Sequence, residues 1–305
     1  MSESSLATTG KAPARYAWLQ RAGKELWPLL TRDKPALLAL GFIVALVLIA
    51  IFAPLIAPYD PIAQSIVNAF KPPSADHWLG TDEFGRDVLS RIIYGARPAL
   101  IVGMLSVLFA MLIGLPIGIL AGLHMGWLDR FVGWTVDIML AFPSLLMALL
   151  IVTLLGSSLP MLVIAIGISN IPLFVRLARS STLVVKNLEF VQMARTFGAS
   201  NLRIIGVHIL PNIIGPIIVM GTLSIAGAIR EEASLSFLGL GVLPPAPSWG
   251  NLVRDGINSI FDAPYLAVLP GIILTLSVLA FNMVGDTLRD ILDPRGLTRR
   301  RPARA

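Results

Sequence analysis

Two uncharged apolar runs of 22 residues, at 36–57 and 100–121, restrict the folds open to this chain of 305 residues. A helix of about 20 apolar residues crosses the hydrocarbon core of a bilayer, which is about 30 Å thick. Only 14% of the residues are charged, whereas soluble domains carry about 25%. Because a helix satisfies its own backbone hydrogen bonds in lipid, we expect an all-α integral membrane protein.

Four more apolar segments bring the expected number of transmembrane helices to six. The expected spans are 36–57, 100–121, 131–155, 159–175, 209–229 and 266–284. The third and fourth spans should form a hairpin through the turn 156–158. In the second span Gly114, Gly118 and Gly122 recur every four residues, which predicts a smooth face that a neighbouring helix approaches closely.

Two polar side chains inside the spans are candidates for the lining or gate of a pathway. Asp137 lies in the third span, which should be kinked at Pro143, and ionisable residues in membranes are often functional. The ordinary alternative is an ion pair with Arg130, seven residues earlier on the same helical face. Asn170 in the fourth span either lines a pathway or relieves a kink at Pro172.

Lysine and arginine predict the orientation, because they concentrate on the cytoplasmic side of membrane proteins. With the N-terminus inside, 18 of the 24 basic residues lie in the cytoplasm, so both termini and the loop 176–208 should be there. The loops 58–97 and 230–265 are then outside. The predicted units are a cytoplasmic tail (1–34), a first helix with its outer loop (35–97), a membrane core (98–288) and a basic cytoplasmic tail (289–305).

Several kinds of chemistry are excluded by what the sequence lacks. There are no cysteines for a disulfide or a thiol nucleophile, and His77, His124 and His208 lie in three separate connectors, so no metal site is expected. No Gly-x-x-x-x-Gly-Lys-Ser/Thr loop is present, so the chain cannot hydrolyse ATP alone. The basic residues flank apolar spans and form no patch for nucleic acid.

The cytoplasmic segment 186–212 has the signals of two short helices joined at a glycine. A helix should run from Lys186 to Phe197, and Gly198 suits the positive φ of a helix C-terminus. Ser200 can cap the second helix, and Pro211 fits the opening turn of the fifth span. The joint would form a knuckle that enters a narrow cleft on another protein.

At these residues the sequence resembles the cytoplasmic coupling motif of ABC-importer permeases. That motif reads Glu-Ala-Ala, three residues, Gly, nine residues, Ile-x-Leu-Pro, and here Gln192 replaces the glutamate, Met193 an alanine and His208 the isoleucine. The expected ATPase-coupling residues are therefore Gln192, Met193, Ala194, Gly198, Ala199, Ser200, His208, Leu210 and Pro211.

Three further stretches, 77–91, 232–251 and 285–295, are similar to the dipeptide/oligopeptide importer permeases, specifically their C-type subunit. The resemblance spans about residues 35–296. It implies the type I permease fold, with six transmembrane helices and both termini inside, in a bacterial cytoplasmic membrane. It also implies a heterodimer with a second permease, two ATPases that bind ATP and Mg²⁺, and an extracytoplasmic solute-binding protein. The chain itself would be non-catalytic and hold no cofactor.

The outer loops contain the candidate contacts with that binding protein, which are Asp82, Arg86 and Trp249. The acids Asp82, Glu83 and Asp87 lie beside Arg86 and Arg91, a grouping that is more typical of a salt-bridged structural cap than of a general acid–base pair. Residues 88–94 alternate at helical spacing, and a short helix on the outer membrane surface is expected there.

Three alternatives to a peptide importer remain open on the sequence. A nickel or glutathione importer permease would share the same hallmark stretches. A secondary transporter driven by an ion gradient would show an internal repeat and ionisable groups near mid-bilayer, and Asp137 is the only acid that falls inside an expected span. A membrane scaffold without transport would have no use for a cytoplasmic knuckle.

Overall fold

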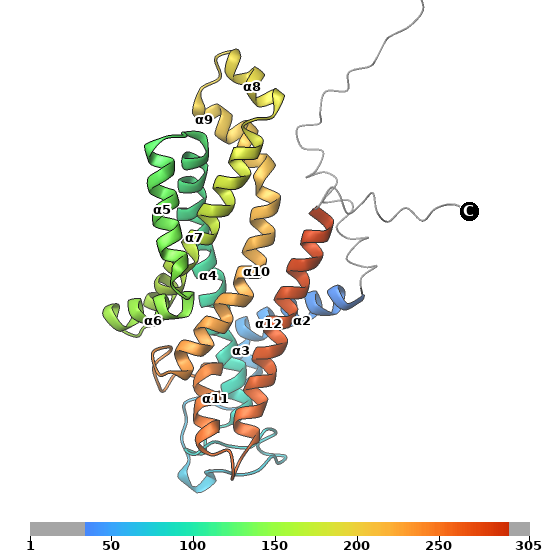
Figure 1. The fold of residues 1–305 in the computed structure, drawn as a ribbon. Coiled ribbons are helices and arrows are strands. Elements are labelled where there is room, and N and C mark those ends of the chain that lie inside the picture. Colours follow the sequence, from blue (N-terminus) through green and yellow to red (C-terminus); the bar gives the residue numbers. More distant parts are fainter. Residues whose placement is uncertain (1–33, 293–305) are drawn as a thin grey trace, which may run out of the picture.

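The computed structural model describes residues 34–292, so the predicted tail 1–34 and most of the tail 289–305 lie outside it, apart from their innermost residues. Within the described residues the regular secondary structure is helical, apart from an isolated antiparallel bridge between Thr81 and Asp87. The α-helices are α2 (Lys34–Ile51), α3 (Ala53–Ile56), α4 (Val88–Leu123), α5 (Trp127–Ala141), α6 (Ser144–Leu155), α7 (Leu159–Val185), α8 (Glu189–Thr196), α9 (Asn201–Arg203), α10 (Leu210–Phe237), α11 (Trp249–Asn258) and α12 (Tyr265–Leu292), with the 3₁₀ turn η1 (Ile66–Asn68) and the π-helical turn η2 (Ile204–Ile209). Figure 1 shows them as an elongated bundle.

The number of membrane-spanning elements agrees with the sequence. Among residues 34–292, five helices are long and apolar enough to cross a bilayer, and a bent pair, α5 with α6, makes six if it counts as one span. These helices extend beyond the apolar runs. The surface helix expected over 88–94 is wrong, because these residues are the first turns of the 36-residue α4. Asp87 starts α4 by accepting hydrogen bonds from the backbone N–H and the hydroxyl of Ser90, at 2.8 and 2.7 Å.

The third expected span is broken much more sharply than a kink. The helices α5 and α6 meet at an angle of 91° around Phe142 and Pro143, and Figure 1 shows α6 lying across the bundle. Pro143 is the N-cap of α6, with extended backbone before it, because proline excludes its predecessor from the helical region. The turn after α6 at Gly156 leads into α7, which forms the expected hairpin.

The glycine face predicted in the second span packs against α7. A Cβ at Gly114 would lie 2.8 Å from the Phe174 Cβ, and one at Gly122 would lie 2.8 Å from the Thr182 Cβ. Side chains at these positions would push the two backbones apart. The small residues therefore let α4 and α7 approach closely along about two helical turns.

The two ends of the bundle carry different connecting segments. The helices α8 and α9 lie together at one end, whereas α11 and the long connector between α3 and α4 lie at the other (Figure 1). This arrangement agrees with the prediction that 176–208 and the loops 58–97 and 230–265 are on opposite sides of the membrane. We call these the knuckle end and the outer end.

Candidate functional site

The knuckle between α8 and α9 is held by a regular helix-stop motif. Gly198 has φ of +79°, which glycine adopts without a steric penalty. The N–H of Ala199 donates to the Ala194 carbonyl and that of Gly198 to the Arg195 carbonyl, both at 3.0 Å, which is the Schellman pattern. The Ser200 hydroxyl accepts from the Arg203 N–H at 3.4 Å and caps α9. The predicted helix, glycine joint and cap are confirmed as local structure, with α8 beginning at Glu189 rather than Lys186.

The tip of the knuckle exposes apolar side chains. Met193, Phe197 and Leu202 have exposed fractions of 58%, 83% and 83%. Of the coupling candidates, Gln192, Gly198 and Ser200 are exposed as well, and Ala194 and Ala199 are partly exposed. Val191 on the opposite side of α8 is buried. An amphipathic element that presents its apolar residues outward in this way is suited to a partner surface.

A continuous helical run joins the knuckle to the membrane. The elements α9, η2 and α10 together form one run from Asn201 to Phe237. Leu210 and Pro211 open α10 directly after the π-helical turn, where the wider turn makes room for the proline ring. His208 lies inside that turn, with its ring 6.0 Å from the Phe190 ring of α8. The fully buried Ile204 and Ile209 pack this run against the rest of the bundle.

A lysine links the C-terminal end of α7 to the C-terminal end of α4. Lys186 follows α7 and donates to the Gly122 carbonyl at 2.7 Å. Its pKa is lowered, first by desolvation and then by the charge of Arg195. The lysine therefore links the ends of α4 and α7 next to the knuckle.

Asp137 does not pair with Arg130, so that interpretation is wrong. Its carboxylate accepts a hydrogen bond of 2.5 Å from Arg176 of α7, and both side chains are more than half exposed. One layer nearer the knuckle, Asp129 accepts from Nε and an Nη of Arg179 at 2.5 and 2.9 Å. The α5 helix runs antiparallel to α7, which brings these residues together across the two helices. A cavity of about 330 Å³ lies between them.

Asn170 is buried and contacts an acid that sequence reasoning did not select. Its amide donates to the Ile166 carbonyl at 2.8 Å and to Glu231 at 3.5 Å. The Ser144 hydroxyl at the start of α6 donates to the other oxygen of Glu231 at 2.6 Å. Asn170 therefore holds a carboxylate in place instead of lining open space in this chain.

Glu231 and the fully buried Glu232 correct the statement that Asp137 is the only acid inside a span. Both lie within α10, which continues to Phe237 and past the expected end of the fifth span. Glu232 accepts from the Ser236 hydroxyl at 2.7 Å. The missed signal was the pair Arg230-Glu231, two charged residues directly after an apolar run without a turn residue between them.

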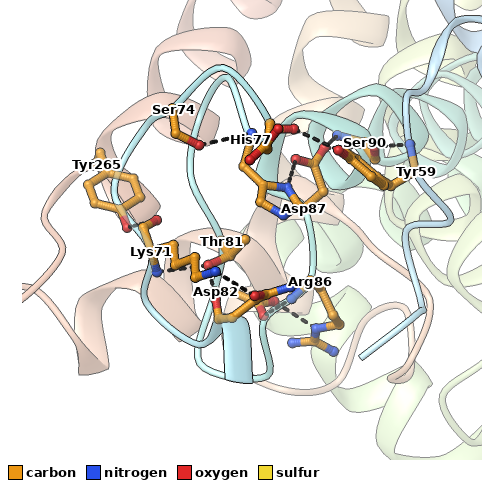
Figure 2. Close-up of polar contacts among 12 residues, drawn as sticks. Tyr59, Lys71, Ser74, His77, Thr81, Asp82, Arg86, Asp87, Ser90 and Tyr265 are labelled. Atoms are coloured by element: carbon orange, nitrogen blue, oxygen red, sulfur yellow. Dashed lines mark hydrogen bonds and ion pairs between the residues drawn. The ribbon is translucent and has the colours of Figure 1, made fainter. Parts of the chain in front are cut away.

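The outer end contains the salt-bridged cap that was expected. Asp82 accepts from the backbone N–H of Phe84 and of Arg86 at 3.0 and 2.9 Å, and from Arg86 Nε at 2.6 Å. Arg91 Nε lies 3.4 Å from the same carboxylate. Figure 2 shows this group beside a second one, in which Asp87 holds the His77 ring at 3.0 Å. These polar contacts thus lie within residues 77–91.

The three predicted binding-protein contacts are not on the surface of this chain. Asp82 and Arg86 are buried inside the cap, and Trp249 is fully buried. The Trp249 indole N–H donates to the Ile92 carbonyl at 3.0 Å, and the ring packs where Gly95 leaves room. These side chains can be buried because their polar groups form hydrogen bonds within the chain. In this chain the three residues therefore have a structural role, and docking of a binding protein at the outer end stays a prediction.

Among residues 34–292, no group of three or more His, Cys, Asp or Glu side chains is arranged to hold a metal ion. The candidate functional features are the apolar knuckle, the helical run that joins it to α10 and the charged groups between the spanning helices.

The sequence of residues 114–296 matches the family described as the binding-protein-dependent transport system inner membrane component. The chain belongs to this family. Residues 22–73 match in addition the N-terminal transmembrane domain of oligopeptide transport permease C. Members of the family are membrane permease subunits of ABC transporters, which work with ATPase and other subunits. An ion-gradient carrier and a passive scaffold are therefore no longer supported.

Curated relatives in this permease family match over most of their length. A dipeptide transport system permease protein of Alkalihalophilus pseudofirmus is 46% identical over 89% of this chain and 90% of its own. A di/tripeptide transport system permease protein of Pseudomonas aeruginosa is 44% identical over 89% and 92%. A glutathione transport system permease protein of Pectobacterium atrosepticum is 41% identical over 89% and 91%.

A solved structure supports the fold of the family. A chain of the MetNI methionine ABC transporter, in an inward-facing conformation, superposes with a TM-score of 0.54 at 18% sequence identity. The match covers 66% of this permease and 96% of that chain. At this identity the likeness establishes the permease fold and nothing about the solute.

Proposed function

We propose that this permease is one half of the membrane pore of an ATP-driven importer for short peptides in a bacterial cytoplasmic membrane. A second, homologous permease forms the other half. Two ATPases that bind ATP and Mg²⁺ dock at the knuckle end, and an extracytoplasmic solute-binding protein delivers the peptide at the outer end. The chain has no catalytic role of its own.

The observation that carries this proposal is the knuckle. Its exposed apolar side chains, Met193, Phe197 and Leu202, are arranged to enter a cleft on another protein. Gln192, Ala194, Gly198 and Ser200 surround them on the same element. A monomeric membrane protein has no reason to present such a tip to water, whereas an ATPase with a matching cleft would cover it.

The mechanism follows from the link between the knuckle and α10. When ATP closes the pair of ATPases, the knuckle moves, and the continuous run Asn201–Phe237 carries the motion across the membrane. At the base of α7, Lys186 passes part of the motion to α4. The two permeases then open outward as rigid bodies, which is alternating access between two states of different stability.

Peptides are the solute class that the relatives favour, since the dipeptide and di/tripeptide permeases are 46% and 44% identical to this chain. A second candidate is glutathione, itself a modified tripeptide, because the glutathione permease is 41% identical over the same share of the chain. Nickel has no comparable support among these relatives.

Reconstitution with its partner subunits tests the proposal. Proteoliposomes that contain the full complex and the binding protein should take up tritiated alanyl-alanine only when ATP is supplied. Gly198→Trp and Ala194→Arg should insert normally but lose uptake by tenfold or more, because a bulky or charged group on the knuckle blocks its cleft, while ATP hydrolysis continues.

Gly156→Trp is the matched control. Gly156 also has a positive φ, +92°, and open space around it, but it lies in the turn between α6 and α7. With its ψ of 160°, Gly156 lies in a region that is open almost only to glycine, so a side chain is strained there at least as much as at Gly198. Because Gly156 lies away from the knuckle, this variant should nevertheless retain coupled uptake. Wild-type uptake by both knuckle variants would remove the coupling assignment, and uphill transport by the permease alone in liposomes would refute the proposed function.

A further inference from the structure

The outward faces of α12 and α4 are aliphatic. On α12 the exposed residues Val268, Ile272, Leu276 and Leu279 form a stripe at helical spacing. On α4 the exposed stripe is Ile101, Met104, Leu105, Leu108 and Leu112. Such faces are suited to lipid chains or to an apolar helix of another subunit.

The outer half of α10 has a different exposed face. Between Ile218 and Phe237, Arg230 is the one residue of α10 that is exposed. Gly227 and Ser234 lie one turn to either side of it on the same face, and Ser234 donates to the Arg230 carbonyl at 2.8 Å. The surface here is therefore small and polar, with a guanidinium projecting from it.

The Arg230 guanidinium forms no ion pair within residues 34–292. It lies 20 residues beyond the start of α10, or about 30 Å along the axis. That distance equals the thickness of a hydrocarbon core of about 30 Å, so Arg230 lies near the outer end of the span, where a guanidinium is more stable facing water or protein than hydrocarbon. Lipid is therefore the least favourable environment for this face of α10.

The rotation of α10 is set by the residue next to Arg230. Glu231 is buried and accepts from Ser144 at 2.6 Å and from Asn170 at 3.5 Å. Successive residues point about 100° apart around a helix. Because Glu231 is held against α6 and α7, Arg230 is turned away from the bundle and stays exposed.

We propose that Arg230 lines the aqueous solute pathway and binds the carboxylate of the passing peptide. This rests on the proposed function, which supplies a solute with a free carboxylate. A guanidinium suits the task, since its planar N–H groups pair with both carboxylate oxygens. Gly227 and Ser234 leave the space that the peptide needs beside the cation.

The first test asks whether this face meets water, and it uses the fact that the chain has no cysteines. Gly227→Cys and Ser234→Cys, in the assembled complex during ATP turnover, should react with a membrane-impermeant sulfonated thiol reagent. Leu276→Cys on the aliphatic face of α12 is the control and should react at least tenfold more slowly. Equal rates at Ser234→Cys and Leu276→Cys would overturn the assignment of α10 to the pathway.

The second test measures the contact itself by uptake of tritiated alanyl-alanine into proteoliposomes. Arg230→Gln should lower the uptake rate by about tenfold or more, the usual effect of losing a hydrogen bond to a charged group. ATP hydrolysis stimulated by the binding protein should not change, because the knuckle is intact. Arg230→Lys should recover part of the rate, since the cation is restored.

Arg130→Gln is the matched control, because Arg130 is also exposed and forms no ion pair within the described residues, but lies on α5. Its uptake should equal the wild type. Wild-type uptake by Arg230→Gln, or equal losses in Arg230→Gln and Arg230→Lys, would overturn the carboxylate contact. If the wild-type complex takes up no peptide at all, the proposed function fails, whereas the labelling result still decides whether Arg230 faces water.

Discussion

Substituting Gly118 by alanine should destabilise the permease, although alanine is the better helix former. A Cβ at this position would lie 2.5 Å from the Val175 carbonyl oxygen, 2.7 Å from the Ala178 Cβ and 3.0 Å from the Arg179 nitrogen. Two of these three atoms belong to the α7 backbone, which cannot rotate away as a side chain would. The helices α4 and α7 must therefore separate locally to admit the methyl group.

The expected magnitude is the difference of two effects. Overpacking a closely packed contact costs about 1–3 kcal/mol, and replacing glycine by alanine in a helix returns up to about 1 kcal/mol. The net loss should thus reach about 2 kcal/mol, which shifts the ratio of folded to unfolded protein by up to about 30-fold. Gly118→Leu should lose more, because the separation would have to be larger.

Thermal unfolding of the detergent-solubilised protein, followed by the fraction that stays monodisperse, measures this. The control is Gly271→Ala in α12, where a Cβ would have no atom within 4 Å. Gly271→Ala should melt at or above the wild-type temperature and Gly118→Ala clearly below it. Identical melting of the two variants would refute the conclusion that the glycine face determines how closely α4 and α7 approach.

Three other variants test the polar contacts. Trp249→Phe should lower the stability by about 1 kcal/mol through loss of the hydrogen bond to Ile92, and Trp249→Ala by about 3–5 kcal/mol. Both losses should appear as lower melting temperatures, and melting of both variants at the wild-type temperature would argue against a buried anchor. Asp129→Asn should loosen α5 from α7 by on the order of 1 kcal/mol, whereas Asp137→Asn should change little, because its ion pair is mostly exposed; hydrogen exchange of α5 distinguishes them, and the reverse order would contradict this reasoning. The pKa of Glu83 is raised above 4.5, first by desolvation and then by the charge of Asp255. The native state therefore binds the proton more tightly than the unfolded state does, and stability falls as pH rises through 4.5 and above. Glu83→Gln should raise the melting temperature at pH 7 but not at pH 4, and an equal gain at both pH values would exclude titration of Glu83 as its source.

The sequence predicts the knuckle and the spans well because their signals are local. Gly198 and Ser200 act through their own backbone and side-chain preferences, and apolar runs report on the solvent around them. The glycine spacing in α4 is also local, and a smooth face has few uses other than close packing. These features need no knowledge of which helix lies next to which.

The misassigned residues depend on neighbours that are distant in sequence. Charged residues such as Asp82 and Arg86 are typical of exposed loops, but here Arg86 donates to Asp82. The desolvation cost of burying the two charges is offset only when the folded cap brings them together. Glu231 is buried because Ser144, 87 residues earlier, donates to it. The same holds for Asp137, whose partner is 39 residues away on α7 and not on its own helix. Helical spacing cannot show such pairs.

The knuckle and Arg230 lie on one continuous helical run, which connects force to solute. Arg230 is 29 residues beyond Asn201, the first residue of that run, or about 43 Å along the axis. A tilt of only about 5° at the knuckle would move the guanidinium by about 4 Å, enough to break a hydrogen bond to a carboxylate. Closure of the ATPases would thus both open the pathway and change the affinity of its cation for the peptide, so one rigid element would suffice to couple the two events.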